Sequence, residues 1–440
     1  MSVNLLGLKS TSISTKKAIN NIVWLFGEKV LTMVLALAIS VILARYLEVS
    51  DFGKFNYLLS VILILMPFSA LGLNAIIVRE LVNSKKESNV IVGTALILRV
   101  AGGIISTLLV VALIQLLDVE LLIPEQWIVL GAIGSSFSSL YIVDFYFQSI
   151  VKSKYVVQVR VVVLIVSSFA KLVGVYYNVK LEYFLWVIVF EPIITGGLLC
   201  LYFIWFKKWS FKLKFEFSYA KELLSQSKWL ILSGVMSIVC LKIDQIMIGE
   251  MLNGEELGIY SVAVRLSEVW YFFPTAIVAS FFPKLLNSRS DSILYEKNLQ
   301  QLCDYLFWLG ITLALVITML SSLIIKVLYG DNYTASSEIL NIHIWSGVFI
   351  FIRALLSKWL IAEGLLSFSL VSHGAAAVMN ILLNYFLIPS FGITGAAWAT
   401  LISYAISGYL ILWFHCKTRP MAEIMTKTTT FPYRVLKKKL

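Results

Sequence analysis

Residues 243–277 read IDQIMIGEMLNGEELGIYSVAVRLSEVWYFFPTAI, which is an apolar segment, a short acidic turn and a second apolar segment. Lys242 and Asp244 lie on the first apolar segment, and Arg265 and Glu268 lie on the second. A charged side chain inside hydrocarbon costs about 3 kcal/mol or more, so such side chains usually face a protein or water interior. The stretch therefore predicts two membrane-spanning helices joined by a tight turn, with a polar inner surface.

The composition extends this interpretation to the whole chain. Of the 440 residues, 59% are hydrophobic and only 14% are charged, and the mean hydropathy is +0.88. A soluble chain carries roughly 25% charged residues. Apolar runs of about 20 residues recur along the sequence, each long enough to span a bilayer as a helix. These features predict an all-α, polytopic membrane protein and exclude a soluble enzyme or an outer-membrane barrel.

We expect about twelve transmembrane helices in two six-helix bundles. The predicted spans lie near 18–46, 52–80, 89–117, 126–150, 155–178, 182–206, 219–249, 256–285, 299–329, 336–362, 365–388 and 394–416. The predicted organisation is an N-terminal lobe (1–206), a basic cytoplasmic linker (207–221), a C-terminal lobe (222–416) and a basic cytoplasmic tail (417–440). Paired repeats of this kind are typical of transporters.

The charges in the loops predict the orientation. Almost all Lys and Arg residues between spans fall on one side, whereas the opposite loops contain only Lys54 and Lys180. By the positive-inside rule, both termini are cytoplasmic. The segment 207–221 is rich in basic and aromatic residues and is suited to an anionic membrane surface.

A short internal repeat supports two related halves. Leu47–Phe55 (LEVSDFGKF) and Leu252–Tyr260 (LNGEELGIY) share a leucine, an acid, a glycine and an aromatic residue at the same positions. We expect the two glycines, Gly53 and Gly258, to lie where a helix restarts after a tight external turn. Coincidence is the alternative for so short a match.

The sequence lacks the motifs of nucleotide and metal chemistry. No GxxxxGK[ST], GxGxxG or HExxH motif occurs, and the four cysteines are isolated from one another. We therefore expect no cofactor, no metal and no ATP hydrolysis, and no nucleic-acid partner.

The charges inside the spans are the candidate site. Lys242 and Asp244 are two residues apart and point in different directions, so at least one needs a partner on another helix or a water-filled cavity. Arg265 and Glu268 are three apart and can form an ion pair or contact a ligand. Arg160 is close enough to a span end to reach the interface.

Lys29 on the first span corresponds in position to Lys242 on the seventh, and Arg353 is a further deeply placed cation. Cations that converge from the two halves would bind an anion such as phosphate or pyrophosphate. Scattered structural charges are the alternative.

Several runs of the sequence resemble those of a known family. The run LKIDQIMIGEMLNGEELGIYSVAVRLSEVWYFFPTAI (241–277) resembles the central signature of polysaccharide and O-antigen flippases in the multidrug/oligosaccharidyl-lipid/polysaccharide exporter superfamily. Further matching runs are NNIVWLFGEKV (20–30), ARYLEVSDFGKFNYL (44–58), LYGDNYTASSEIL (328–340) and IPSFGITGAAWATLISY (388–404). The similarity covers nearly the whole chain.

The resemblance implies a MATE-like exporter fold that moves an undecaprenyl-pyrophosphate-linked repeat unit across the bacterial inner membrane by alternating access. It places Asp244, Gln245, Arg265 and Glu268 on the cavity and Glu28 on the opening motif; we add Asp144 as a second ion-coupling or supporting residue. An ion gradient or the membrane potential would supply the energy. The implied partners are a lipid-linked oligosaccharide, membrane lipids, and a polysaccharide polymerase with its chain-length regulator.

Two other functions are considered. A multidrug cation antiporter of the same superfamily would favour acidic residues in its cavity. The cations Lys29, Lys242, Arg265 and Arg353 instead favour an anionic cargo. A membrane glycosyltransferase or polymerase would need an acidic catalytic cluster and usually a large external loop, and no long external loop is predicted.

Overall fold

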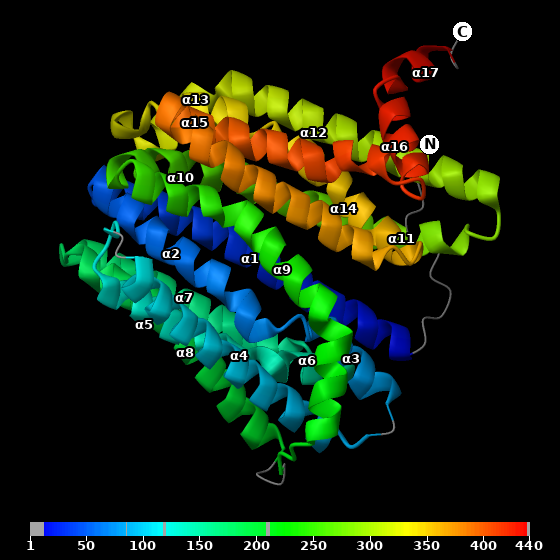
Figure 1. Ribbon diagram of the computed structural model, residues 1–440, viewed down its shortest axis with the longest axis horizontal. Helices are drawn as coiled ribbons and strands as arrows, with labels where there is room; N and C mark the ends of the chain where they lie inside the picture. The colour runs from blue at the N-terminus through cyan, green and yellow to red at the C-terminus, as the bar shows by residue number, and fades with distance from the viewer. Residues whose placement is uncertain (1–12, 85, 118–119, 208–211, 438–440) are drawn as a thin grey trace. The chain divides into compact units, whose positions relative to one another are not determined.

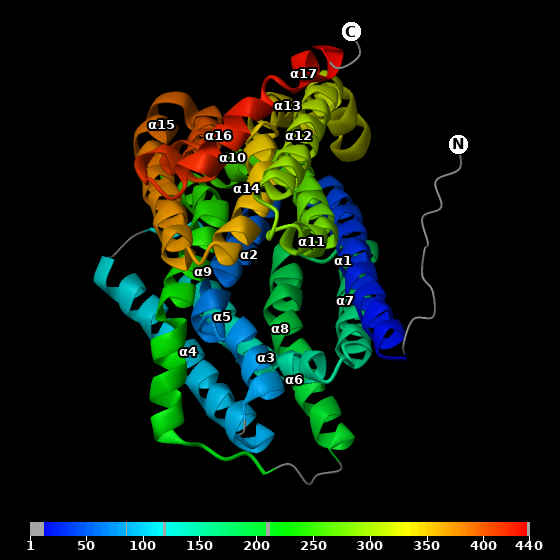
Figure 2. The same ribbon diagram turned by 90° about the vertical axis from the view of Figure 1, so that its right-hand side faces the viewer.

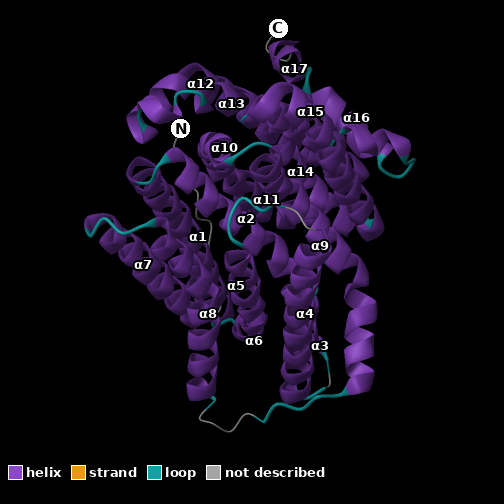
Figure 3. Ribbon diagram, turned by 60° about the vertical axis from the view of Figure 1, so that its left-hand side comes forward, coloured by secondary structure: helices purple, strands orange, loops and turns teal. Residues whose placement is uncertain are grey.

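A computed structural model describes residues 13–84, 86–117, 120–207 and 212–437. In these residues every regular element is a helix and no strand is present (Figure 3). This confirms the all-α fold class. Apolar runs in hydrocarbon become helices because a helix satisfies its own backbone hydrogen bonds without water.

Figure 1 follows the helices in chain order. The α-helices are α1 (Ile13–Tyr46), α2 (Val49–Ala70), α3 (Asn74–Asn83), α4 (Ser88–Leu117), α5 (Glu125–Ser136), α6 (Ile142–Ser149), α7 (Lys154–Tyr176), α8 (Leu181–Phe206), α9 (Phe217–Met251), α10 (Gly254–Glu268), α11 (Phe272–Asn287), α12 (Ser292–Tyr329), α13 (Ser336–His343), α14 (Ser346–Ala362), α15 (Leu366–Gly408), α16 (Arg419–Thr428) and α17 (Phe431–Lys437). Short 3₁₀ helices are η1 (Phe137–Tyr141), η2 (Val269–Tyr271), η3 (Asp331–Tyr333) and η4 (Leu410–Phe414).

Within the described residues, 11 helical segments are long and apolar enough to cross a membrane. The last of them, Ser367–Phe414, has 48 residues and combines the two final predicted spans. Gly392 inside it has φ 58° and ψ −142°, which is not helical. A Cβ on Gly395 would come within 2.6 Å of the Leu387 carbonyl carbon, eight residues earlier. Because eight residues of straight helix span about 12 Å, the chain must reverse here, so α15 consists of two crossings.

The described chain divides into two compact units. Unit 1 consists of Met1–Ile39, Phe68–Leu113 and Val129–Lys228, and unit 2 of Ser40–Pro67, Ile114–Ile128 and Trp229–Leu440. The segment Ser40–Pro67, from the first half of the sequence, thus groups with the second half. The predicted N-terminal and C-terminal lobes divide the chain in sequence order at residues 207–221. That division stays a prediction.

In unit 1, α7 lies beside α8 (Figures 1 and 2). The helix α8 also packs on η1. α3 packs on α6. The buried core of unit 1 contains Leu73, Ile77, Phe147 and Tyr219. In the described part of the basic linker, the Lys214 amide donates to the Asn89 carbonyl at 3.3 Å, and the Glu216 amide donates to Thr94 Oγ1 at 3.1 Å.

The same linker carries exposed ion pairs. Lys86 Nζ lies 2.8 Å from Glu216 Oε1, and Lys214 Nζ lies 2.9 Å from Glu87 Oε2. The hydrogen bond from Lys86, and a second one from the Ser218 hydroxyl, lower the pKa of Glu216. Exposed pairs contribute little to stability, so the backbone hydrogen bonds are the main attachment of this segment to α4.

In unit 2, α14 packs against α11, α12 and α15, and α10 packs against α13. The core is built from apolar side chains such as Leu306, Phe351, Leu355 and Leu356. The two repeat glycines also meet in this unit. A Cβ on Gly53 would overlap the Gly254 carbonyl oxygen, and a Cβ on Gly258 would overlap the Val49 carbonyl oxygen.

Both repeat glycines lie inside helices, Gly53 in α2 and Gly258 in α10, and neither has a positive φ. Each is the fifth residue of a helix that restarts after a short turn, since α1 ends at Tyr46 and α2 begins at Val49, and α9 ends at Met251 and α10 begins at Gly254. The expected position is therefore confirmed. The two glycines are required because the two backbones approach more closely than a side chain permits.

The C-terminal segment forms helices that pack on α12 (Figure 2). Gln300 Nε2 donates to the Ile424 carbonyl at 3.0 Å, and Trp308 Nε1 donates to the Thr428 carbonyl at 3.0 Å. Arg434 Nη2 lies 2.8 Å from Asp304 Oδ1, and the Asp304 side chain is only 4% exposed. The predicted tail is thus anchored on α12 through residue 434.

Replacing Arg434 with alanine should release this anchor, because the buried Asp304 carboxylate loses its cation and keeps, among the described residues, the hydrogen bond from Gln300, 2.9 Å away. We expect a destabilisation of about 1–3 kcal/mol, measured as a lower unfolding temperature and faster proteolysis of residues 429–437. Lys427→Ala is the control, because its pair with Glu296 is 3.7 Å long and exposed. Equal effects of both substitutions would contradict the assigned anchor.

Candidate functional site

Lys242 and Glu268 form an ion pair between α9 and α10. Lys242 Nζ lies 2.8 Å from Glu268 Oε1 and 2.9 Å from Oε2. The two side chains are 10% and 18% exposed, and both helices belong to membrane-spanning segments. The prediction that Lys242 or Asp244 has a partner on another helix is confirmed, because Lys242 on α9 pairs with Glu268 on α10.

The ion pair between Arg265 and Glu268, one of the two alternatives for these residues, is not formed in the part of the chain that the structure describes. Glu268 is engaged by Lys242, which would otherwise be a buried charge without a counter-ion. Arg265 is half-buried, and its side chain makes no ion pair or hydrogen bond with the part of the chain that the structure describes. Arg265 lies three residues, or about one helical turn, before Glu268 on α10.

Asp244 is held by hydrogen bonds from three directions. Its Oδ2 accepts from the Tyr260 hydroxyl at 2.5 Å and from Thr400 Oγ1 at 3.3 Å, and its Oδ1 accepts from the Gln245 amide at 2.8 Å. Asp244 is 1% exposed. These donors offset part of the cost of burying a carboxylate.

The neighbours of Asp244 extend this polar cluster across α2, α9, α10 and α15. Ser60 Oγ donates to Gln245 Oε1 at 2.7 Å, and Asn384 Nδ2 donates to Asn380 Oδ1 at 3.1 Å, while Asn380 lies 3.5 Å from Thr400. Gln245 was predicted as a site residue, whereas its partner Ser60 and the residues Tyr260, Thr400, Asn380 and Asn384 were not. The available signal was the pair of asparagines four residues apart, on one face of an apolar helix.

Arg353 lies in the core of unit 2, 7% exposed. Its guanidinium donates to the Ser407 carbonyl and to Ser372 Oγ, the latter at 3.1 Å. These hydrogen bonds join α14 to α15. A role for Arg353 in binding substrate stays a prediction.

In unit 1, Glu28 and Asp144 are brought together by Arg160. Arg160 Nη2 lies 2.7 Å from Asp144 Oδ2, and Nη1 lies 3.4 Å from Glu28 Oε1. The carboxylates are only 4% and 7% exposed. The expectation that Arg160 extends to the membrane interface is wrong, because it bridges two buried acids on different helices.

Arg99 is a second buried cation in this unit, 2% exposed. Its Nη2 donates to the Ser138 carbonyl at 2.9 Å, its Nη1 donates to Asn74 Oδ1 at 3.3 Å, and the guanidinium lies 5.6 Å from the Phe145 ring centroid. Ser138 belongs to η1, the 3₁₀ segment between α5 and α6. The arginine thus supplies a donor to a backbone carbonyl at a break in the α-helix, deep in a membrane span.

Lys29 lies in unit 1 and is exposed, whereas Lys242 lies in unit 2 and is paired. Convergence of these two cations stays a prediction.

The fold and these interior charges define a multi-pass helical membrane protein with polar clusters inside its spans. The sequence profile of a family described as polysaccharide biosynthesis protein matches residues 42–338. The chain belongs to this polysaccharide biosynthesis protein family, and the predicted resemblance is confirmed.

Individual relatives agree with this assignment. A candidate O-antigen transporter of Shigella flexneri is 23% identical over 45% of this chain and 47% of its own length. A candidate low-salt glycan biosynthesis flippase of Haloferax volcanii, Agl15, is 26% identical over 44% of this chain and 42% of its own length. The capsular polysaccharide biosynthesis protein CapF of Staphylococcus aureus is 21% identical over 88% of this chain and 97% of its own length. The chain thus spans about half the length of the first two relatives.

Solved structures share the fold. The lipid II flippase MurJ, in an inward closed conformation, superposes with a TM-score of 0.69 at 16% identity, over 96% of this chain and 93% of that one. An inward-facing multidrug resistance MATE family transporter of the MOP superfamily superposes with a TM-score of 0.67 at 12% identity, over 90% of this chain and 96% of that one. At such low identity the likeness shows the fold alone, and it confirms the predicted MATE-like architecture.

Proposed function

We propose that this protein is a flippase that moves an undecaprenyl-pyrophosphate-linked oligosaccharide, such as an O-antigen or a related repeat unit, across the bacterial inner membrane by alternating access. Membership in the polysaccharide biosynthesis family and the names of the relatives support the lipid-linked cargo. The observation that carries the proposal is the Lys242–Glu268 pair inside membrane-spanning helices, with Arg265 one turn away and without an acidic partner in the described chain.

A diphosphate headgroup needs cations that can leave their resting partners. Lys242 is held by a single carboxylate on the neighbouring helix, so an arriving diphosphate can compete with Glu268 for the ammonium group. Arg265 offers a planar guanidinium that binds phosphate oxygens in a bidentate manner. In this mechanism Glu268 neutralises Lys242 when the site is empty, Asp244 and Gln245 support the hairpin, and Lys29 and Arg353 are further cations for the headgroup.

Coupling to an ion gradient is proposed for the unit 1 cluster. Glu28 Oε2 and Asp144 Oδ1 are buried and have no hydrogen-bond partner among the described residues. Buried carboxylate oxygens of this kind can take up a proton or a small cation. The absence of nucleotide-binding motifs from the sequence makes a gradient or the membrane potential the natural energy source.

The test is complementation of a strain that lacks the chromosomal gene. Lys242→Ala and Arg265→Ala should each lower surface polysaccharide by about a hundredfold, because the headgroup loses a charged contact of about 2–5 kcal/mol. Surface polymer is measured on gels of extracted polysaccharide, and protein level is measured by immunoblotting of membranes. Lys326→Ala is the control, since Lys326 is 73% exposed.

Loss of Lys242 also leaves Glu268 without its cation, so the double variant Lys242→Ala/Glu268→Ala separates stability from function. If Lys242 serves only to neutralise Glu268, the double variant restores both protein and polymer. If Lys242 binds the headgroup, protein level recovers and polymer does not. Normal polymer in both single variants would refute the proposal.

A cation antiporter is the second candidate, favoured by the buried acids Glu28 and Asp144. Arg160 contacts both acids, which leaves little charge for an organic cation. Ethidium accumulation in the same strains decides between the two: an antiporter predicts that deletion of the gene raises accumulation, and the flippase predicts no change. The polymerase and chain-length regulator remain proposed partners, as consumers of the translocated repeat unit.

A further inference from the structure

Residues 212–217, the described end of the basic linker, connect two membrane-spanning helices, and we call them the strap. They follow α8, whose span ends at Phe206, and they lead into α9, whose span begins at Phe217. Figure 3 draws residues 212–216 as a loop before α9. The strap and the α4 residues that it contacts belong to unit 1. Because it connects the ends of two spans, the strap lies at the level of the membrane surface.

The strap is extended and lies directly against the first turns of α4. The amides of Lys214 and Glu216 donate to the Asn89 carbonyl and to Thr94 Oγ1, at 3.3 and 3.1 Å. Amides two residues apart that bond to one neighbour are the pattern of an extended chain. A Cβ on Gly93 would come within 2.5 Å of the Lys214 carbonyl oxygen, so the two backbones are in close contact.

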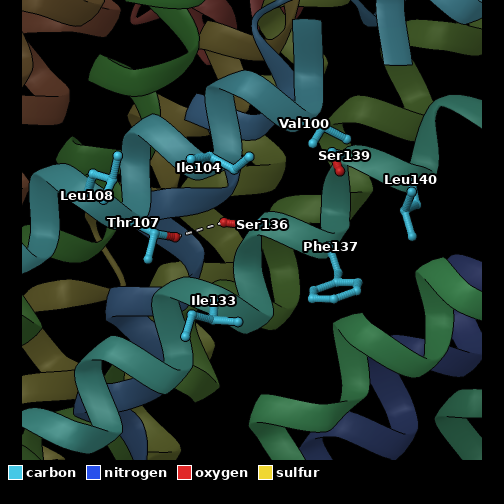
Figure 4. A pocket seen from close by; sticks show the side chains of 9 residues that line it. All are labelled: Val100, Ile104, Thr107, Leu108, Ile133, Ser136, Phe137, Ser139 and Leu140. Carbon is cyan, nitrogen blue, oxygen red and sulfur yellow. Dashed lines mark hydrogen bonds between the residues drawn. The ribbon is translucent and has the colours of Figure 1, made fainter. Parts of the chain in front are cut away.

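The helix α4 is itself attached to the rest of unit 1 farther along its length. Thr107 Oγ1 and Ser136 Oγ are 2.9 Å apart, joined by the dashed line in Figure 4, and both donate to the Gly103 carbonyl. A Cβ on Gly103 would come within 2.9 Å of the Ser136 Cβ, so α4 and α5 are in direct contact. The strap is therefore fastened to a fixed part of unit 1.

The even-numbered side chains of the strap form ion pairs with the protein. Lys214 Nζ lies 2.9 Å from Glu87 Oε2, and Glu216 Oε1 lies 2.8 Å from Lys86 Nζ. Lys86 and Glu87 come directly before α4. These contacts turn the charged face of the strap toward the protein.

The odd-numbered side chains are apolar and open. Leu213, Phe215 and Phe217 are 49%, 47% and 77% exposed. Successive side chains of an extended chain point to opposite faces. The strap therefore has a charged face that the protein engages and an apolar face that the described residues leave uncovered.

The neighbouring end of α8 has the composition of a membrane–water boundary. Lys152 Nζ lies 5.0 Å from the Phe206 ring centroid, and Lys207 Nζ lies 4.5 Å from the Tyr146 ring centroid. Trp205 is 67% exposed. Aromatic rings and long cationic side chains gather where hydrocarbon meets the lipid headgroups. The surroundings of the strap thus favour lipid as the partner of its apolar face.

We propose that Leu213, Phe215 and Phe217 insert among the lipids at the membrane surface, so that the strap is an interfacial anchor of unit 1. This inference does not depend on the flippase function. The apolar face of an interfacial segment is buried about 5–10 Å into the boundary between headgroups and acyl chains. The lysine-rich composition of the linker predicts an electrostatic contact with anionic lipid, whereas the structure uses Lys214 inside the protein and leaves apolar side chains for the membrane.

The test is electron paramagnetic resonance of the spin-labelled full-length protein in nanodiscs. A nitroxide is attached at Phe215→Cys or, as the matched control on the charged face, at Lys212→Cys. The accessible cysteines are first removed as Cys200→Ser and Cys416→Ser, and the two buried cysteines stay. Collisions are measured with oxygen, which concentrates in lipid, and with a nickel complex, which stays in water. We expect the oxygen-to-nickel ratio to be about fivefold higher at residue 215 than at residue 212, because only the apolar face is inserted.

The lipid composition separates an apolar contact from an electrostatic one. The ratio at residue 215 is measured in nanodiscs of phosphatidylcholine alone and in nanodiscs that also contain phosphatidylglycerol. We expect the two values to agree within about twofold, because burial of an apolar face does not require charged lipid. A ratio that rises only with phosphatidylglycerol would overturn the apolar contact.

Two sets of substitutions test which face makes the contact. Leu213→Ser/Phe217→Ser removes the other two apolar side chains, so the ratio at residue 215 should fall to that at residue 212. Lys214→Gln removes an exposed ion pair that contributes little, so the ratio should stay within about twofold of its original value. The reverse pattern would show that charge, and not apolar insertion, holds the strap at the membrane.

Two further results would overturn the proposal, and both are read without any other change in the strap. Equal ratios at residues 215 and 212 would mean that the apolar face is in water. Low access of both oxygen and the nickel complex to residue 215 would mean that protein, such as a second copy of the chain, covers this face. Neither result involves surface polymer, so the flippase proposal and the strap proposal stand or fall separately.

Discussion

Gly53→Ala should remove most of the folded protein from the membrane. A Cβ at this position would overlap the carbonyl oxygen of Gly254 and come within 2.9 Å of the Gly258 amide nitrogen. These are backbone atoms of α10, so no side-chain rotation relieves the overlap. The helices α2 and α10 would have to separate, and with them the packing that holds Ser60 on α2 against Gln245 on α9.

Overpacking of a well-packed contact lowers the free energy of unfolding by about 1–3 kcal/mol. Because the overlap here is with backbone atoms, we expect a loss at or above the upper end of this range. The measurement is the amount of protein extracted in mild detergent and its unfolding temperature. Gly258→Ala should behave alike, because its Cβ would overlap the Val49 carbonyl oxygen.

Gly234→Ala is the matched control for both substitutions. Gly234 also lies inside a helix of unit 2, α9, and a Cβ there would meet no atom within 4 Å. Alanine has a higher helix propensity than glycine by about 1 kcal/mol, so this variant should be as stable as the wild type or more so. Wild-type stability of Gly53→Ala would mean that α2 and α10 do not pack as described.

Arg160→Leu should be the most damaging single substitution among the interior charges of unit 1. Arg160 contacts Asp144 at 2.7 Å and Glu28 at 3.4 Å, and both carboxylates are buried. Removing the shared cation leaves two uncompensated acids inside a membrane span. Loss of one partner from a buried pair costs about 3–5 kcal/mol, so we expect low membrane levels and a reduced unfolding temperature.

The triple variant Glu28→Gln/Asp144→Asn/Arg160→Leu tests whether charge balance is the cause. It removes all three charges together and should recover most of the lost protein, because a buried ionic cluster is replaceable by neutral groups at little cost. If the triple variant is as unstable as Arg160→Leu, the damage comes from lost packing of the arginine side chain. If it is stable but makes no surface polymer, the carboxylates have a role in transport beyond stability.

The family and the fold class were predictable from the chain alone, and particular residues show why. The run at 241–277 carried the family signature, and long apolar stretches can only become helices in hydrocarbon. The break between the last two spans was visible in Pro389, Gly392 and Gly395, and Gly392 has the positive φ that a reversal requires. These features depend on local chemistry and chain length, which a sequence displays directly.

The partners of the charged residues were much less predictable. Spacing along α10 left open whether Arg265 and Glu268 pair with each other or contact a ligand, and it gave no sign that Glu268 binds Lys242 on α9. Arg160 looked like an interfacial residue, because its distance from a span end is visible in the sequence and its acids on other helices are not. Asp244 accepts hydrogen bonds from Tyr260 on α10 and Thr400 on α15. These residues meet only because α10 and α15 pack beside α9 in the folded protein.

The sequence by itself determined that this is a polytopic helical membrane protein of the polysaccharide biosynthesis family with charges inside its spans, because hydropathy, glycine and proline positions and a family signature are local properties. The tertiary structure decided which of those charges neutralise one another, why Gly53 and Gly258 must be glycine, and which face of residues 212–217 is left exposed. Each of these depends on atoms that are separated by tens to hundreds of residues along the chain, and it is the packing of helices that brings such atoms within hydrogen-bond or van der Waals distance.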